Sequence, residues 1–175
     1  MRAFPILSAC LVLLAVPAFA ASPPKHPKTG PQAIGTFEDW TAAVNKSGGQ
    51  TVCYAFARPH ASTPTLPGRG SVVFTVTERS ASRDEVAISV GFAFAPNATA
   101  TLDIHGHGFD LYTGQRSAFA RDGHAVVEAM IRGSEATTRV PGPKGKDVAD
   151  TFSLRGFDKA YAAIVKRCPA GKSAT

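Results

Sequence analysis

The chain has 175 residues, and 19 Lys and Arg against 13 Asp and Glu give it a formal net charge of +6 at pH 7. The basic residues are scattered instead of forming one stripe, which argues against nucleic-acid binding, because that function needs clustered basic side chains interleaved with exposed aromatic ones. Diffuse positive charge instead favours anionic surfaces such as a lipid headgroup layer, lipopolysaccharide or a host glycan.

The first 20 residues have the pattern of a secretory signal peptide. Arg2 supplies the positive charge, residues 7–16 form an apolar run, and residues 18–20 (Ala-Phe-Ala) carry the small residues that signal peptidase reads. The run is too short for a transmembrane helix, which needs about 20 apolar residues. We therefore expect cleavage near Ala20, no transmembrane span, and a periplasmic, secreted or cell-surface location.

An alternative interpretation is a lipoprotein box at residues 7–10, which would leave the protein anchored through Cys10. That box belongs at the end of the apolar core, whereas here the core continues past Cys10, so we prefer the signal peptide. Residues 21–33 are rich in proline and predict a poorly ordered leader. The ordered domain is expected over residues 34–169, with a flexible tail at residues 170–175.

Loss of the signal peptide leaves two cysteines, Cys53 and Cys168. In an oxidising compartment they most simply pair with each other, and the disulfide would tie the first predicted strand to the last predicted helix. The alternative is a nucleophilic Cys53 with a histidine partner. It is the weaker hypothesis, because an exported thiol without a reducing system is a poor nucleophile.

Most of the mature chain alternates apolar and polar residues with the period of a strand. The loops between these segments, at residues 59–70 and 139–146, are rich in proline and glycine. The predicted strands are residues 51–58, 71–78, 85–95, 99–105, 109–113, 117–120 and 150–154. Two segments have helical spacing, residues 124–132 and residues 157–168. The pattern predicts a mainly β single domain, a β-sandwich or a partly closed barrel, with one or two short helices including a C-terminal one.

No set of residues indicates a catalytic mechanism or a cofactor. His105 and His107 share a face at strand spacing, and Asp103 and Asp110 are close enough in sequence to add oxygen ligands to a metal. The alternating glycines predict an exposed corner instead, and one cluster of this size rarely completes a metal site. The sequence contains neither a nucleophile elbow nor a zinc-protease motif, so we do not expect an enzyme.

Short motifs follow one another along nearly the whole mature chain. They are residues 37–40 (FEDW), 52–54 (VCY), 58–59 (RP), 72–77 (VVFTVT), 92–94 (FAF) and 150–157 (DTFSLRGF), the last leading into an Ala-rich helix and Cys168. In this order they resemble the invasion-associated locus B family of alphaproteobacterial exported proteins. The resemblance implies a periplasmic or surface-associated β-sandwich, linked in some pathogens to entry into host cells, and it brings no catalytic residues.

We therefore expect a non-enzymatic envelope protein whose loops bind a protein, a glycan or an anionic lipid surface. The candidate contacts are His60 and Arg69 in the 59–70 loop, His105 and His107 at the corner, and Lys144 and Lys146 in the loop at residues 141–146. One alternative is a small exported inhibitor of a host or competitor enzyme. Another is a metal-binding or hydrolytic protein that uses His105 and His107.

Overall fold

The computed structural model describes residues 30–171 of the chain. The predicted signal peptide, most of the leader and the last four residues of the tail lie outside the described residues, so these expectations stay predictions. Among residues 30–171, no helix is long and apolar enough to cross a membrane.

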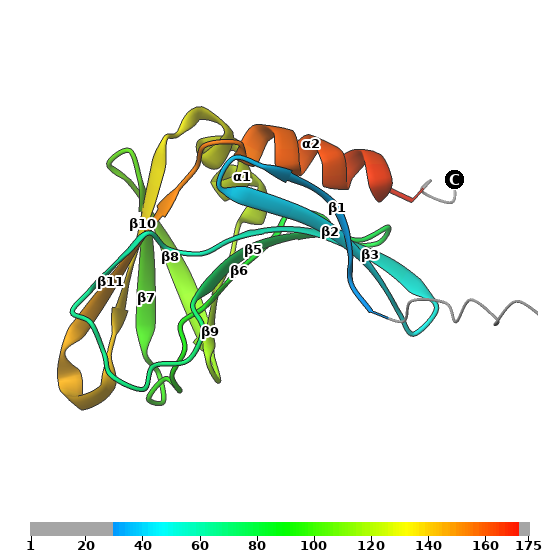
Figure 1. The fold of residues 1–175 in the computed structure, drawn as a ribbon. Helices are drawn as coiled ribbons and strands as arrows, with labels where there is room; N and C mark the ends of the chain where they lie inside the picture. The colour runs from blue at the N-terminus through cyan, green and yellow to red at the C-terminus, as the bar shows by residue number, and fades with distance from the viewer. Residues whose placement is uncertain (1–29, 172–175) are drawn as a thin grey trace, which may run out of the picture.

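Eleven strands form one antiparallel sheet, and two α-helices pack on it (Figure 1). The prediction of a mainly β domain with a C-terminal helix is confirmed. The strands lie in the order β1-β2-β3-β5-β6-β9-β8-β7-β10-β11-β4. Their bounds are β1 Gln32–Phe37, β2 Trp40–Ser47, β3 Gln50–Ala57, β4 Ala61–Thr63, β5 Val73–Glu78, β6 Glu85–Ser89, β7 Thr99–Ile104, β8 His107–Gly114, β9 Ser117–Ala120, β10 Glu135–Pro141 and β11 Asp147–Ser153.

The sheet is open, but a short crossing brings its two ends close together. β4 follows β3 in the chain after only three residues, Arg58–His60, yet lies eight positions away in the sheet order. Four Cα steps span at most about 14 Å, so the sheet must curl until β4 and β11 approach β3. The backbone N–H of His60 already donates to the carbonyl of Thr151 in β11 at 2.9 Å. Of the two predicted arrangements, the partly closed barrel describes this single curled sheet more closely.

Figure 1 shows the chain leaving β3 and crossing toward β10 and β11, while α2 lies along β1, β2 and β3. α2 (Phe157–Arg167) buries Phe157, Ala160 and Ile164, which recur at the spacing of one helical face. α1 (Gly123–Arg132) likewise buries Val126, Val127 and Met130. Its first turn is capped by Asp122, whose carboxylate accepts a hydrogen bond from the N–H of Ala125 at 3.0 Å. Both predicted helices are confirmed.

The centre of the core is an aromatic cluster drawn from distant parts of the chain. Trp40 in β2 contacts Phe157 in α2 and Phe74 in β5, with ring centroids 4.8 and 5.7 Å apart. Phe74 in turn contacts Phe152 in β11 at 5.2 Å. The indole N–H of Trp40 donates to the carbonyl of Ser153 at 3.0 Å, which satisfies the polar atom of this buried side chain.

The structure differs from the predicted local elements at four places. β1, β2 and β10 were not expected, and β1 begins at Gln32, two residues before the predicted domain boundary. The first three residues of the loop predicted at residues 139–146 belong to β10, and the loop also contains a short 3-10 helix, Pro143–Gly145. The strand predicted over residues 85–95 ends at Ser89, because Gly91 with φ +78° ends the extended conformation. The 59–70 loop contains β4, a strand too short to give a period.

Candidate functional site

A surface pocket of about 490 Å³ lies where the two ends of the curled sheet approach each other. We call it the seam pocket. Its walls come from the β1–β2 turn, the adjoining ends of β2 and β3, the short crossing, and the connection from β11 to α2. The lining residues are Asp39, Thr41, Phe56, Ala57, Arg58, Pro59, His60, Ser153 and Arg155.

Hydrogen bonds between the β1–β2 turn and the end of β11 fix one wall of the seam pocket. The hydroxyl of Ser153 donates to Asp39 Oδ2 at 2.7 Å, and the backbone N–H of Asp39 donates to the carbonyl of Arg155 at 3.3 Å. Gly156, with φ +80°, allows the close approach, because a Cβ atom there would lie 2.2 Å from the carbonyl oxygen of Phe37. The wall is therefore held by backbone geometry as well as by side chains.

Three basic side chains line the seam pocket, and all three are exposed. Arg155 Nε lies 3.2 Å from Glu38 Oε2, and Lys159 Nζ lies 3.3 Å from the other oxygen of the same carboxylate. His60 Nε2 is 3.7 Å from Glu135 Oε2. Within residues 30–171, Arg58 takes part in no ion pair. The pocket lining thus holds two arginines and a histidine together with one carboxylate, that of Asp39.

Arg69, a predicted loop contact, is instead the buried anchor of the 59–70 loop. Its side chain is 7% exposed and makes two parallel bonds to the fully buried Asp150, Nη1 to Oδ1 at 2.8 Å and Nη2 to Oδ2 at 2.6 Å. Its Nε donates to the carbonyl of Val90 at 2.7 Å, and Ser62 also donates to Asp150 at 2.6 Å. Arg69 therefore holds the loop that presents His60 and does not itself face solvent.

The other predicted contacts lie away from the seam pocket. His105, with φ +53°, forms the β7–β8 turn, and its Nε2 accepts from the N–H of Ser134 at 3.2 Å. His107 begins β8 and packs edge-on against Phe109 at 4.7 Å. Both histidines line a second pocket of about 330 Å³ together with Glu128. In the described part of the chain, no three His, Cys, Asp or Glu side chains gather as metal ligands.

Lys144 and Lys146 follow β10 in the chain, and Lys146 does not line the seam pocket. Lys144 is in the 3-10 helix Pro143–Gly145, and Lys146 is an exposed residue directly after it. Of the five predicted loop contacts whose side chains the structure describes, only His60 lines the seam pocket. Sequence reasoning missed the roles of Arg58, Arg155 and Asp39, although all three lie in motifs that carry the family resemblance.

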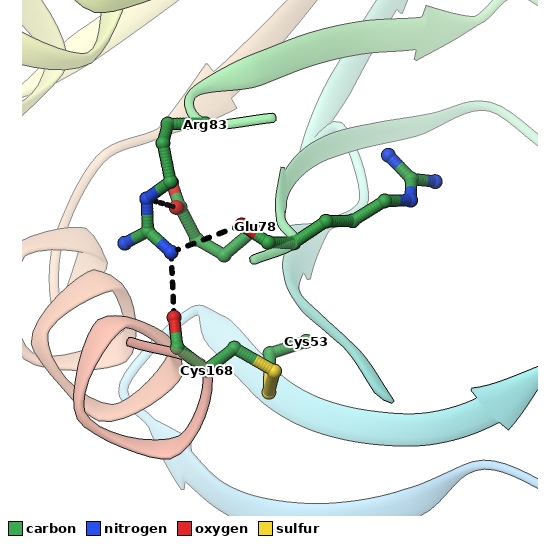
Figure 2. Close-up of a disulfide and its surroundings, with 5 residues drawn as sticks. Cys53, Glu78, Arg83 and Cys168 are labelled. Atoms are coloured by element: carbon green, nitrogen blue, oxygen red, sulfur yellow. Dashed lines mark hydrogen bonds and ion pairs between the residues drawn. A yellow bond between two sulfur atoms is a disulfide. The ribbon is translucent and has the colours of Figure 1, made fainter. Parts of the chain in front are cut away.

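The predicted disulfide is present: Cys53 in β3 is bonded to Cys168 at the end of α2, with their Cα atoms 5.9 Å apart. Arg83 lies beside it and connects two neighbours (Figure 2). Arg83 Nη1 donates to the carbonyl of Cys168 at 2.5 Å, and Arg83 Nε lies 2.6 Å from Glu78 Oε2. The guanidinium thereby links the C-terminal end of α2 to the end of β5.

A buried acidic cluster surrounds this arginine. Asp84 accepts hydrogen bonds from the Tyr161 hydroxyl at 2.5 Å and from His124 Nδ1 at 2.9 Å, and its backbone N–H donates to Glu78 Oε1 at 3.0 Å. Burial raises the pKa of Glu78 to about 7. Burial would also raise the pKa of Asp84, but the hydrogen bonds from Tyr161 and His124 hold it below the ordinary value. The same bond to Asp84 raises the pKa of His124.

These shifts predict that stability decreases as the pH rises from about 4.5 to about 7. In that range the folded protein keeps a proton on Glu78 that the unfolded chain has released, so deprotonation favours unfolding. The hydrogen bond from protonated His124 to Asp84 adds a decrease that begins above about pH 6.5, because it is lost as the pH rises through the raised pKa of His124. Urea unfolding at a series of pH values should show a shallower decrease for Glu78→Gln than for the wild type.

The matched control is Glu135→Gln, since Glu135 is an exposed glutamate outside the cluster. It should unfold with the wild-type dependence on pH. An unchanged dependence in Glu78→Gln would show that Glu78 ionises normally in the folded protein.

Comparison with known proteins gives a family and a similar fold. The profile of the family described as Invasion associated locus B (IalB) protein matches residues 40–165. The crystal structure of invasion associated protein b from Bartonella henselae is similar, with a TM-score of 0.57 and 14% sequence identity, covering 78% of this chain and 96% of that chain. At this identity the similarity concerns the fold. No curated protein matches the chain significantly.

Proposed function

The chain belongs to the invasion associated locus B family, and from this premise we propose that it is an exported, non-enzymatic envelope protein that binds its partner at the seam pocket. The family assigned from the sequence motifs is confirmed. The candidate partners are those proposed from the sequence, namely a protein, a glycan or an anionic lipid surface.

The disulfide supports export. Both cysteines are buried, and the bond joins residues 115 positions apart, so it is a structural crosslink of the whole domain. Disulfides of this kind form and persist in oxidising compartments outside the cytosol. Together with the signal-peptide pattern of residues 1–20, it favours a periplasmic or cell-surface location.

The seam pocket is the observation that carries the binding function. It is concave and collects exposed cationic side chains from segments that are far apart in the chain. The ends of the crossing are fixed by β3 on one side and by the buried Arg69–Asp150 pair on the other. Loops held on a rigid scaffold in this way commonly form binding surfaces.

A photo-cross-linking residue in place of His60, introduced in the native bacterium, tests this function. After irradiation of whole cells, we expect an adduct in the periplasmic or surface fraction. Intact mass of the unreacted protein should correspond to Ala21 to Thr175 less two hydrogens, which reports export, cleavage near Ala20 and the disulfide together.

The same photo-cross-linking residue in place of Asn97, an exposed turn residue far along the sheet, is the control. Equal adducts from both positions, or none from His60, would contradict binding at the seam pocket. A mass retaining residues 1–20, or a lipid-modified mass that begins at Cys10, would contradict the location.

A further inference from the structure

We propose that the seam pocket recognises an acidic sugar residue, a pyranose ring that carries a carboxylate beside free hydroxyl groups. This inference rests on the binding function proposed above and names the ligand class of the same pocket. It follows from three kinds of group that the pocket places side by side: arginine forks, a carboxylate acceptor and an apolar surface.

The arginines are available for an anionic group of the ligand. Arg58 is exposed and, in the part of the chain that the structure describes, is committed to no acidic partner. Arg155 forms an ion pair with Glu38 through Nε, and Lys159 pairs with the same carboxylate at 3.3 Å. Arg155 can therefore bind a ligand while Glu38 keeps a basic partner. A guanidinium binds a carboxylate through two parallel hydrogen bonds, which gives both affinity and orientation.

Asp39 makes a purely anionic ligand a poor fit. Its Oδ2 accepts from Ser153, and within residues 30–171 its Oδ1 has no hydrogen-bond donor. A bare phosphate or the phosphate layer of a membrane would be repelled by this oxygen. A sugar hydroxyl can donate to it while the carboxylate of the same residue binds the arginines.

Phe56 and Pro59 supply the apolar surface of the pocket. Phe56 is half-buried on the face of β3 opposite the buried Ala55 and Ala57, next to Tyr54 with ring centroids 6.0 Å apart. Rings of this kind pack against the C–H face of a pyranose and remove apolar area from water. The pocket volume of about 490 Å³ lies in the ordinary range for small-molecule sites.

Binding of two matched oligosaccharides to the purified mature protein tests the inference. The acidic probe is a hyaluronan tetrasaccharide, which alternates glucuronate with N-acetylglucosamine, and the neutral probe is a tetramer of N-acetylglucosamine. Chemical-shift titration should show binding of the acidic probe and at least about tenfold weaker binding of the neutral one. Arg58→Gln and Arg155→Gln should each lower the affinity for the acidic probe by about tenfold or more, because each removes a charged hydrogen bond.

Arg167→Gln is the matched control, because Arg167 is exposed in the last turn of α2, at the other end of the helix from Arg155. It should bind the acidic probe like the wild type. Asp39→Asn should weaken binding of the acidic tetrasaccharide, because the sugar hydroxyl loses its charged acceptor. It should strengthen binding of inorganic phosphate, because it removes the charge that repels that ion. Equal binding of the two tetrasaccharides, or phosphate binding as tight as that of the acidic probe to the wild type, would overturn the inference.

Two further measurements identify the source of the sugar and test binding at the seam pocket independently of the ligand class. Retention on the bacterium's own lipopolysaccharide, or on immobilised hyaluronan, supports an envelope or a host source respectively. If His60 cross-links a partner in cells while neither sugar surface retains the protein, the ligand class is wrong and binding at the seam pocket stands.

Discussion

Removal of the disulfide is expected to lower the free energy of unfolding by about 4–5 kcal/mol in Cys53→Ala/Cys168→Ala. The bond closes a loop of more than 100 residues, and in the chain-entropy model it restricts the unfolded chain by about this amount. Both sulfur atoms lie in the apolar core, so their replacement by alanine adds a smaller loss of packing to this effect. Urea unfolding of a protein that comprises residues 21–175 gives the difference directly.

Reduction separates the effect of the crosslink from that of the side chains. Wild type unfolded in the presence of a thiol reductant should lose about the same stability as the double variant, and the double variant itself should not respond to reductant. Should the oxidised and reduced wild-type proteins unfold at the same urea concentration, the disulfide would not constrain the unfolded chain in the way proposed.

The second large effect is expected at the buried ion pair of the 59–70 loop. Asp150→Ala should destabilise the domain by about 3–5 kcal/mol, because it leaves the guanidinium of Arg69 buried without its acidic partner. The loop should also loosen, since Ser62 loses its acceptor in the same change. Urea unfolding measures the first effect, and faster hydrogen exchange of the His60 N–H measures the second.

Two comparisons test the assignment of this cost to an unpaired charge. Arg69→Leu/Asp150→Leu should recover part of the stability that Asp150→Ala loses, because neither charge remains buried. Glu38→Gln, which removes the exposed ion pairs with Arg155 and Lys159, should change stability by no more than about 1 kcal/mol. A loss in Asp150→Ala as small as that of Glu38→Gln would show that the guanidinium finds solvent.

The sequence predicted those elements whose side chains carry a strong period. β5 and β8 alternate apolar with polar residues, β3 alternates large with small apolar ones, and α2 repeats Phe157, Ala160 and Ile164 on one face. β2 and β10 were missed because alanine and threonine carry much of their buried faces, as at Ala42 and Thr138. Their place in the sheet is decided by pairing with neighbours and not by their own hydrophobicity.

The candidate site was harder to predict, because its parts meet only through the topology. The sequence pointed to the 59–70 loop and to His60, but it gave no sign that Arg69 turns inward, since its partner Asp150 is 81 positions away. The acidic cluster was hidden for the same reason: Glu78, Asp84, His124 and Tyr161 come from four separate segments. The disulfide was predictable because only two cysteines follow the predicted signal peptide.

The contact of Trp40 with Phe157 and the carbonyl of Ser153 has a consequence for the order of folding in time. Trp40, the first fully buried residue of the domain, is covered by Phe157 and bonded to Ser153, which lie near its C-terminal end. The packing around Trp40 is therefore incomplete until nearly the whole chain is present. Contacts between such distant positions are formed slowly, because a long loop must close first. We therefore expect the domain to complete its core only after its final helix is available, late in the formation of the chain.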